Sequence, residues 1–154
     1  MKLLRNSGSD RVVDAIRGHS SSELSLDYVS RGFSLPAFGE IAQFLNELTV
    51  CRLILQEIPA SELGVCGSDI DRAARNKLNL RWLAMRCIKW AELRVDFRGV
   101  PKAPPQSALV IRRDGSDAAD KSISGNCPFT TEGFGLAPGD RMSLIQCSDT
   151  PEEA

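Results

Sequence analysis

Histidine is almost absent from this sequence of 154 residues, which contains only His19. The sequence contains five cysteines, which is an odd number, and no two of them form a C-x-x-C pair. A structural zinc site needs about four His or Cys ligands at close spacing, and a disulfide framework needs cysteines that can pair. We therefore expect no metal site, no cofactor, and reduced cysteines that mostly serve as small core side chains.

Long apolar runs and phosphate-binding loops are also missing. No stretch of about 18 apolar residues exists, so the sequence predicts no membrane-spanning helix and no membrane association. The opening Met-Lys-Leu-Leu is too short for the core of a signal peptide, and we expect a cytoplasmic protein. No G-K-[ST] motif follows a glycine-rich loop, which excludes a P-loop ATPase.

What is present indicates one globular domain over residues 1–154. Hydrophobic residues make up 42% of the chain and charged residues 25%, enough for a sizeable core and close to ordinary values. The last residues, from Thr150 to Glu153, have the composition of a helix start with acids in its first turn. The chain ends there, and we expect it to be truncated at its C-terminus relative to a larger protein.

Hydrophobic periodicity predicts alternating strands and helices. Strands are expected at 24–29, 50–55, 93–98, 107–113 and 141–147, with another ending near 123. Helices are expected after Ser9, from Ser34 to about 48, and from about 69 to 91. This order favours the α/β class, with a mixed central sheet flanked by helices. Four residues are expected to be mostly buried in it, namely Leu53, Ile54, Val110 and Ile111.

The longest predicted helix carries most of the basic residues. Its core stripe is expected to comprise Leu80, Ala84, Cys87, Ile88 and Ala91. Arg75, Arg86 and Lys89 lie along another side. Trp82 lies among these cations, where it would either cover the sheet, the favoured role, or act as a stacking platform for a base.

Charge is distributed unevenly along the chain. Residues 72–113 carry a formal charge of +9, whereas the residues on either side together carry −10. A basic segment between acidic flanks favours binding of a polyanion such as DNA or RNA. The alternative is a solvated helix face with no ligand, and composition alone does not separate the two.

The segment from Ser122 to Phe134, SISGNCPFTTEGF, has the only pattern that looks like a functional motif. It resembles the Gly-Ser-x-Asn-Phe-Thr-x-x-Gly-Leu signature of phospholipase D-like phosphodiesterases. Four matching positions are Gly125, Phe129, Thr130 and Gly133. Three positions depart from the signature, namely Asn126 for Ser, Pro128 for Asn and Phe134 for Leu. The order of the other segments is similar to the phospholipase D-like domain at the N-terminus of some bacterial superfamily-two helicases. The resemblance implies a phospholipase D-like sandwich followed by a helicase region that this chain lacks.

The residues that such enzymes use for catalysis are missing. The resemblance places a His-x-Lys pair, the phosphate nucleophile and its charge partner, near Gln106 and Ala108, give or take two residues. Neither residue can do that chemistry, and Pro128 removes a further polar group. We therefore expect no phosphodiesterase activity. Cys127 is the alternative nucleophile by location, although no base lies near it in sequence. His19 is interpreted as an exposed residue after a helix end.

The turn around Gly125 allows two interpretations. Its backbone N–H groups and the hydroxyls of Thr130 and Thr131 would form a cradle for phosphate. Alternatively the turn is purely structural, with glycines that satisfy tight backbone geometry and Phe129 in the core.

Together these features predict a non-catalytic, phospholipase D-like module associated with a helicase. It would bind nucleic acid through a set of five residues, Arg75, Arg86, Lys89, Thr130 and Thr131, or contact a protein partner, either the helicase or a second copy. The alternative function is that of a phosphodiesterase or nuclease of the same superfamily.

Overall fold

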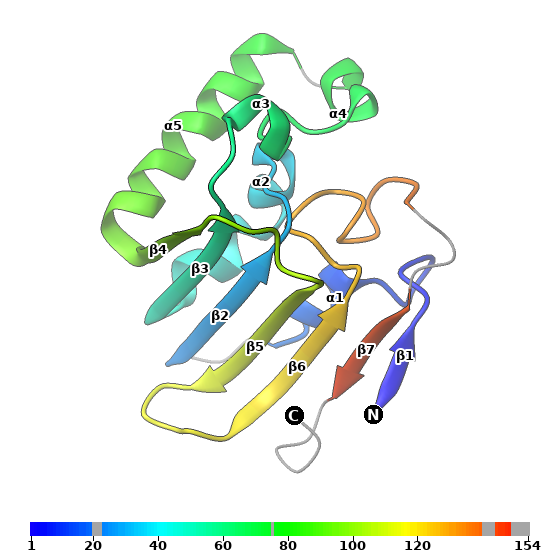
Figure 1. Cartoon of the computed structure of the whole chain (residues 1–154), viewed down its shortest axis with the longest axis vertical. Coiled ribbons are helices and arrows are strands. Elements are labelled where there is room, and N and C mark those ends of the chain that lie inside the picture. The colour runs from blue at the N-terminus through cyan, green and yellow to red at the C-terminus, as the bar shows by residue number, and fades with distance from the viewer. Residues whose placement is uncertain (20–22, 75, 140–143, 149–154) are drawn as a thin grey trace.

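A computed structural model describes residues 1–19, 23–74, 76–139 and 144–148. Those residues form one seven-stranded sheet, with strands in the order β1-β7-β6-β5-β2-β3-β4, and five helices (Figure 1). The strands are β1 Lys2–Leu4, β2 Leu24–Ser30, β3 Val50–Gln56, β4 Val95–Val100, β5 Ser107–Arg113, β6 Ala119–Gly125 and β7 Ile145–Ser148. The helices are α1 Val12–Arg17, α2 Leu35–Glu47, α3 Ala60–Leu63, α4 Asp69–Ala74 and α5 Lys77–Arg94.

The sheet is mixed, which confirms the predicted α/β class. Strands β2, β3 and β4 run parallel, and the remaining neighbours pair antiparallel. The parallel strands are connected through helices, as parallel strands require a crossover. Strand β1, which the sequence analysis did not predict, is only three residues long and pairs with β7 at one edge.

One face of the sheet forms the core. Helices α1 and α2 cover this face (Figure 1), and the alternate residues that point toward them, such as Leu53 and Ile111, are buried as predicted. The neighbours Ile54 and Val110 point to the opposite face and are only half-buried. Their predicted burial was wrong because side chains alternate along a strand and no described helix covers the second face.

Helix α2 begins where the sequence predicts. The Ser34 side chain accepts a hydrogen bond from the Ala37 N–H at 3.3 Å, and Pro36 lies in the first turn. A proline fits there because the first N–H groups of a helix have no partner inside it. Eight residues of α2 are buried, so it is the central helix of the core.

The helix predicted at 69–91 is two helices. Helix α4 begins with a reciprocal capping pair, since Ser68 Oγ accepts from the Asp71 N–H and the Asp71 carboxylate accepts from the Ser68 N–H, at 3.3 and 3.2 Å. Asn76 then caps α5, with its side-chain oxygen accepting from the Asn79 N–H at 2.8 Å, and its extended backbone separates the two helices. Because α5 continues to Arg94, the next strand starts at Val95 rather than at 93.

Helix α5 packs on α2 rather than on the sheet. Leu83 lies against Gly39, where an added Cβ would come within 2.9 Å of the leucine, and Trp90 contacts Phe38 with ring centroids 5.2 Å apart. The buried residues of α5 are Leu83, Cys87 and Trp90. Of the predicted core stripe, only Cys87 is fully buried, and Ile88 is 57% exposed.

Residues 141–143 of the predicted last strand and the predicted helix start at 150 lie outside the described residues. Strand β5 is followed by a turn at Asp114-Gly115, with Gly115 at a φ of +77°. None of the described helices has the length and apolar character needed to cross a membrane.

Candidate binding surface and the signature turn

Residues 125–134, here called the signature turn, need glycine at two positions. Gly125 has a φ of +125°, which L side chains rarely adopt, and an added Cβ would overlap the Leu144 carbonyl oxygen. At Gly133, an added Cβ would overlap the Pro128 carbonyl oxygen. Both glycines therefore serve close backbone packing inside the protein.

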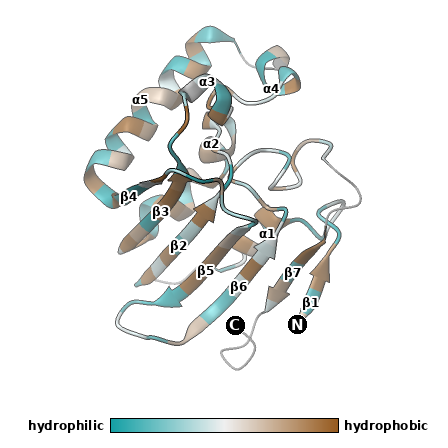
Figure 2. Ribbon diagram, in the orientation of Figure 1, coloured by the Kyte–Doolittle hydropathy of each residue, from teal (hydrophilic) through white to brown (hydrophobic). Residues whose placement is uncertain are grey.

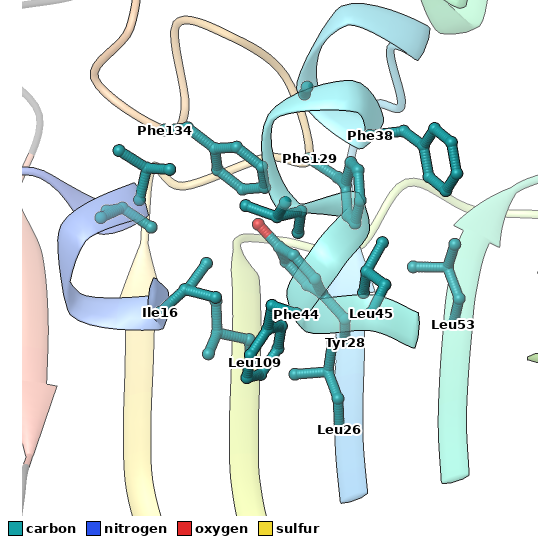
Figure 3. Close-up of a cluster of buried hydrophobic side chains, with 14 of the residues drawn as sticks. Ile16, Leu26, Tyr28, Phe38, Phe44, Leu45, Leu53, Leu109, Phe129 and Phe134 are labelled. Carbon is teal, nitrogen blue, oxygen red and sulfur yellow. The ribbon is translucent and has the colours of Figure 1, made fainter. Parts of the chain in front are cut away.

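The aromatic residues of the turn are part of the core. Phe129 is 1% exposed and stacks on Phe33, with ring centroids 4.8 Å apart. Figure 3 shows Phe129 and Phe134 among the core side chains, close to Tyr28 from β2. The Tyr28 hydroxyl donates to the Cys127 carbonyl at 2.6 Å. These contacts fasten the turn to β2 and to the segment that follows it.

The polar groups of the turn already have protein partners. The Phe129 N–H donates to Ser30 Oγ at 2.8 Å, and the Gly133 N–H donates to Thr130 Oγ1 at 3.1 Å. The Thr131 hydroxyl donates to the Asp71 carboxylate of α4 at 2.5 Å, and both residues are buried.

The charges beside Thr131 are also negative. In addition to the bond to Asp71, a Glu132 carboxylate oxygen lies 3.4 Å from Thr131 Oγ1. A phosphate could bind this hydroxyl only by replacing its hydrogen bond to Asp71. The geometry therefore favours the structural interpretation of the turn over the phosphate cradle predicted for Thr130 and Thr131.

The expected catalytic positions lie beside the turn. Ser107, the first residue of β5, pairs with Gly125, so Gln106 directly precedes the strand and is exposed. Ala108 follows and is half-buried. Residues 104–111 contain no His or Lys, so shifting the register by two residues either way supplies no nucleophile of the expected kind.

Cys127 is placed as an inert core residue. Its side chain is fully buried, and burial raises the pKa of the thiol from its ordinary value of 9.0 to about 12. The thiol donates weakly to the Ser107 carbonyl, with Sγ 3.8 Å from the oxygen. A reactive cysteine needs a lowered pKa and access to solvent, and Cys127 has neither. His19 follows the end of α1, where its backbone N–H donates to the Ile16 carbonyl at 3.1 Å.

Helix α5 presents a different surface to solvent, here called the outer face. Its apolar residues occur at intervals of three to five along the helix. They are Leu78, Trp82, Met85, Ile88 and Leu93, exposed by 76%, 54%, 65%, 57% and 70%. Figure 2 shows hydrophobic and hydrophilic residues mixed along α5 instead of separated into two sides. The predicted role of Trp82 as a cover for the sheet was wrong, because α5 turns Leu83, Cys87 and Trp90 inward.

Cations lie among these apolar residues. Arg81 and Lys89 are exposed, and Arg86 is half-buried with its guanidinium over the Trp82 ring, 4.7 Å from the ring centroid. None of the three forms an ion pair with a residue that the structure describes. Most arginines elsewhere are paired with acids, namely Arg11, Arg17, Arg52, Arg72, Arg98, Arg112 and Arg113.

Of the five predicted binding residues, the structure brings Arg86 and Lys89 together on α5. Thr130 and Thr131 have their hydrogen-bond partners in the turn and in α4, and Arg75 lies outside the described residues. The exposed apolar residues of α5 were missed, although Leu78, Trp82 and Met85 already follow helical spacing in the sequence.

The second face of the sheet holds a shallow cleft lined by residues of β2, β3 and β4. Its Asp27 accepts from Arg52, with one N–O distance of 2.9 Å, and also from Arg112 at 2.8 Å, while Arg98 lies 3.5 Å from Asp96. These charges pair with one another and leave little unmet charge for a ligand. Nowhere in the described part of the chain do three or more His, Cys, Asp or Glu residues gather to hold a metal ion.

Comparisons with known proteins add no family assignment. No family model matches the chain, and a search of curated proteins finds no match.

Proposed function

We propose that this chain is a non-catalytic module of the phospholipase D-like type, associated with a helicase, that binds nucleic acid weakly through the outer face of α5. The observation that carries the proposal is the group of three cations, Arg81, Arg86 and Lys89, which have no acidic partner among the described residues. Unpaired cations next to an exposed Trp suit the phosphates and bases of a single strand.

The absence of catalysis is supported by three observations at the signature turn. Residues 104–111 contain no His or Lys, the hydroxyls of Thr130 and Thr131 are engaged, and the Cys127 thiol is buried. Purified protein is therefore expected not to hydrolyse bis-p-nitrophenyl phosphate. Turnover that persists through purification and disappears in Cys127→Ala would contradict this part of the proposal.

Binding is tested by fluorescence anisotropy with a labelled single strand and a labelled duplex at low and moderate salt. Affinity should fall steeply with salt, because phosphate contacts release counterions, with a log–log slope of about −0.7 to −0.9 per phosphate. The Arg86→Glu, Lys89→Glu double variant should lose binding. A matched control is Arg98→Glu, Lys102→Glu, which reverses two exposed charges away from α5. If the wild type does not bind at low salt, α5 is not a nucleic-acid surface. The same holds if the Arg86→Glu, Lys89→Glu variant binds as well as the Arg98→Glu, Lys102→Glu control.

A second candidate function is docking of a protein partner on the same helix. It is favoured by the five exposed apolar side chains of the outer face, which phosphate binding does not use.

A further inference from the structure

The outer face of α5 is more apolar than a helix surface in contact with water should be. A surface helix normally places apolar residues toward the core and polar residues toward solvent. Helix α5 has apolar residues on both sides, with Leu83, Cys87 and Trp90 buried against α2 and five large side chains exposed. Large apolar side chains gathered on a second, exposed side of a helix indicate a second contact surface. The structure shows what covers the inner side, and the outer side has no cover among the described residues.

The five exposed side chains form a continuous stripe. From Leu78 through Trp82 and Met85 to Ile88 the intervals are three or four residues, close to one helical turn, and Leu93 follows five residues later. The stripe runs for about 22 Å at about 1.5 Å per residue. A stripe of this period and length matches the side chains that two packed helices exchange. Contiguous exposed apolar patches of this kind mark interaction sites.

The charges on α5 define the partner further. The helix contains five cations and only one acid, Glu92. Arg81, Arg86 and Lys89 lie on the same side as the apolar stripe and form no ion pair with a described residue. A complementary surface therefore carries acidic side chains on either side of an apolar stripe.

Two other occupants fit less well. A second copy packed through its own α5 would place cations opposite cations, which costs energy at an interface. Nucleic acid would use the cations, but the aliphatic side chains of Leu78, Met85 and Ile88 gain nothing from contact with phosphate. Only the Trp82 ring stacks on bases, and Arg86 already covers one of its faces.

We propose that the outer face of α5 is a docking site for an amphipathic helix of a protein partner, with apolar side chains every three to four residues flanked by Glu or Asp. Docking of this kind places the helix of the partner along α5, with its apolar side chains against Met85 and Ile88 at the centre of the stripe. Its acids lie beside Arg81 and Lys89. This goes beyond the weak binding of nucleic acid, and the two ligands would compete for the same face.

The test uses a labelled synthetic peptide of about 18 residues, with Leu every three to four positions and Glu on both sides of that stripe. A peptide of the same composition, with its Leu residues spread around the helix, is the negative control. Binding is followed by fluorescence anisotropy and by tryptophan emission. Trp90 is already buried, so a blue shift on binding reports that the exposed Trp82 ring is covered. Because contact is largely apolar, binding of the striped peptide should persist at about 0.3 M salt, where phosphate contacts are strongly weakened.

Matched variants separate the apolar and charged contributions. Ile88→Gln should weaken peptide binding about tenfold, a usual effect for a central interface residue. Ile70→Gln on α4 is the matched control, because Ile70 is about as exposed as Ile88 (59% against 57%) but lies outside α5. It should change the affinity for the peptide less than twofold. Arg81→Glu, Lys89→Glu should also weaken binding of the peptide, and a version with Lys in place of Glu should bind this variant better than the wild type.

The outcomes distinguish this inference from the proposed function. Binding of the striped peptide that Ile88→Gln weakens and Ile70→Gln leaves unchanged supports the inference. If a labelled single strand binds and the peptide does not, the inference is wrong and the proposed function stands. If the protein instead self-associates in sedimentation runs, and Ile88→Gln abolishes this, the occupant is a second copy and the inference is wrong. If neither ligand binds, both proposals fail.

Discussion

The hydrogen bond between Thr131 and Asp71 gives the sharpest test of whether the signature turn is structural. The Thr131 hydroxyl donates to the Asp71 carboxylate at 2.5 Å, and the two residues are 3% and 5% exposed. The carboxylate also accepts from the N–H and the hydroxyl of Ser68, both at 3.2 Å. Thr131→Val keeps the shape of the side chain and removes a hydrogen-bond donor from this buried carboxylate.

The expected cost follows from the chemistry of that carboxylate. A hydrogen bond to a charged group contributes about 1.5–3 kcal/mol to stability. Loss of the Thr131 hydroxyl leaves the buried Asp71 carboxylate with one hydrogen bond fewer, and no water replaces it at low cost. We therefore expect Thr131→Val to lower the free energy of unfolding by about 1.5–3 kcal/mol. For a chain of this length, about 2–4 °C of melting temperature corresponds to each kcal/mol, so the shift should be about 3–12 °C.

The measurement is thermal and urea unfolding followed by circular dichroism. Thr49→Val is the matched control because Thr49 is exposed, and it should change stability by less than about 0.5 kcal/mol. Combining Thr131→Val with Asp71→Asn should cost clearly less than the sum of the single changes, since the two residues share one interaction. A Thr131→Val protein as stable as the Thr49→Val protein, with additive effects, would refute the structural interpretation and make the hydroxyl available to a ligand.

Three further predictions concern Gly133 and the cysteines. Gly133→Ala should lower the free energy of unfolding by more than about 2 kcal/mol, because its Cβ meets backbone, whereas Gly139→Ala, with its nearest atom at 3.4 Å, should be nearly neutral. Equal melting temperatures would show that the close approach is absent. Exposed Cys66 should react with a thiol reagent at pH 8 far faster than buried Cys127; equal rates would contradict the burial. Stability should also fall as pH rises from about 9 toward 12. In that range unfolded thiols ionise, while burial holds the pKa of Cys51 and Cys127 at about 12 and keeps both protonated; a flat pH profile would count against this.

Much of the fold could be predicted because local and long-range preferences agree. Helix α2 has a serine cap, a proline in its first turn and a single apolar stripe, and all three indicate the same boundaries and the same buried side. Strand β5 was predicted with its observed bounds for a similar reason, since its β-branched residues are followed directly by an Asp-Gly turn.

Helix α5 could not be predicted to the same extent because its sequence is ambiguous. Apolar residues lie on both of its sides, so periodicity alone does not select which side is buried. The choice is made by the partner: Gly39 of α2 leaves room for Leu83, and Phe38 receives Trp90. Those contacts join residues more than forty positions apart, and nothing in the local sequence of α5 indicates them.

The candidate site shows the same limit. The sequence left two interpretations of the turn open, and the structural one follows from residue types, because its glycines suit tight turns and Phe129 suits a core. The engagement of Thr131 depends on Asp71, which is 60 positions away in the sequence, and was not predicted. A short motif therefore indicated the backbone geometry of the turn but not whether its hydroxyls remain available to a ligand.

The turn and the helix differ in how completely their groups are satisfied within the chain, and this difference supports the proposal that α5 is the binding surface. In the turn, glycine, aromatic ring and hydroxyl each have an internal partner. On α5, Leu78, Met85 and Ile88 are exposed, and Arg81 and Lys89 form no ion pair with a described residue. Exposing these groups gives the isolated fold no stability, since large apolar side chains gain free energy only when they are covered. The pattern is explained if a partner covers α5, and the motif-like turn then serves to hold α4, β2 and β5 together behind it.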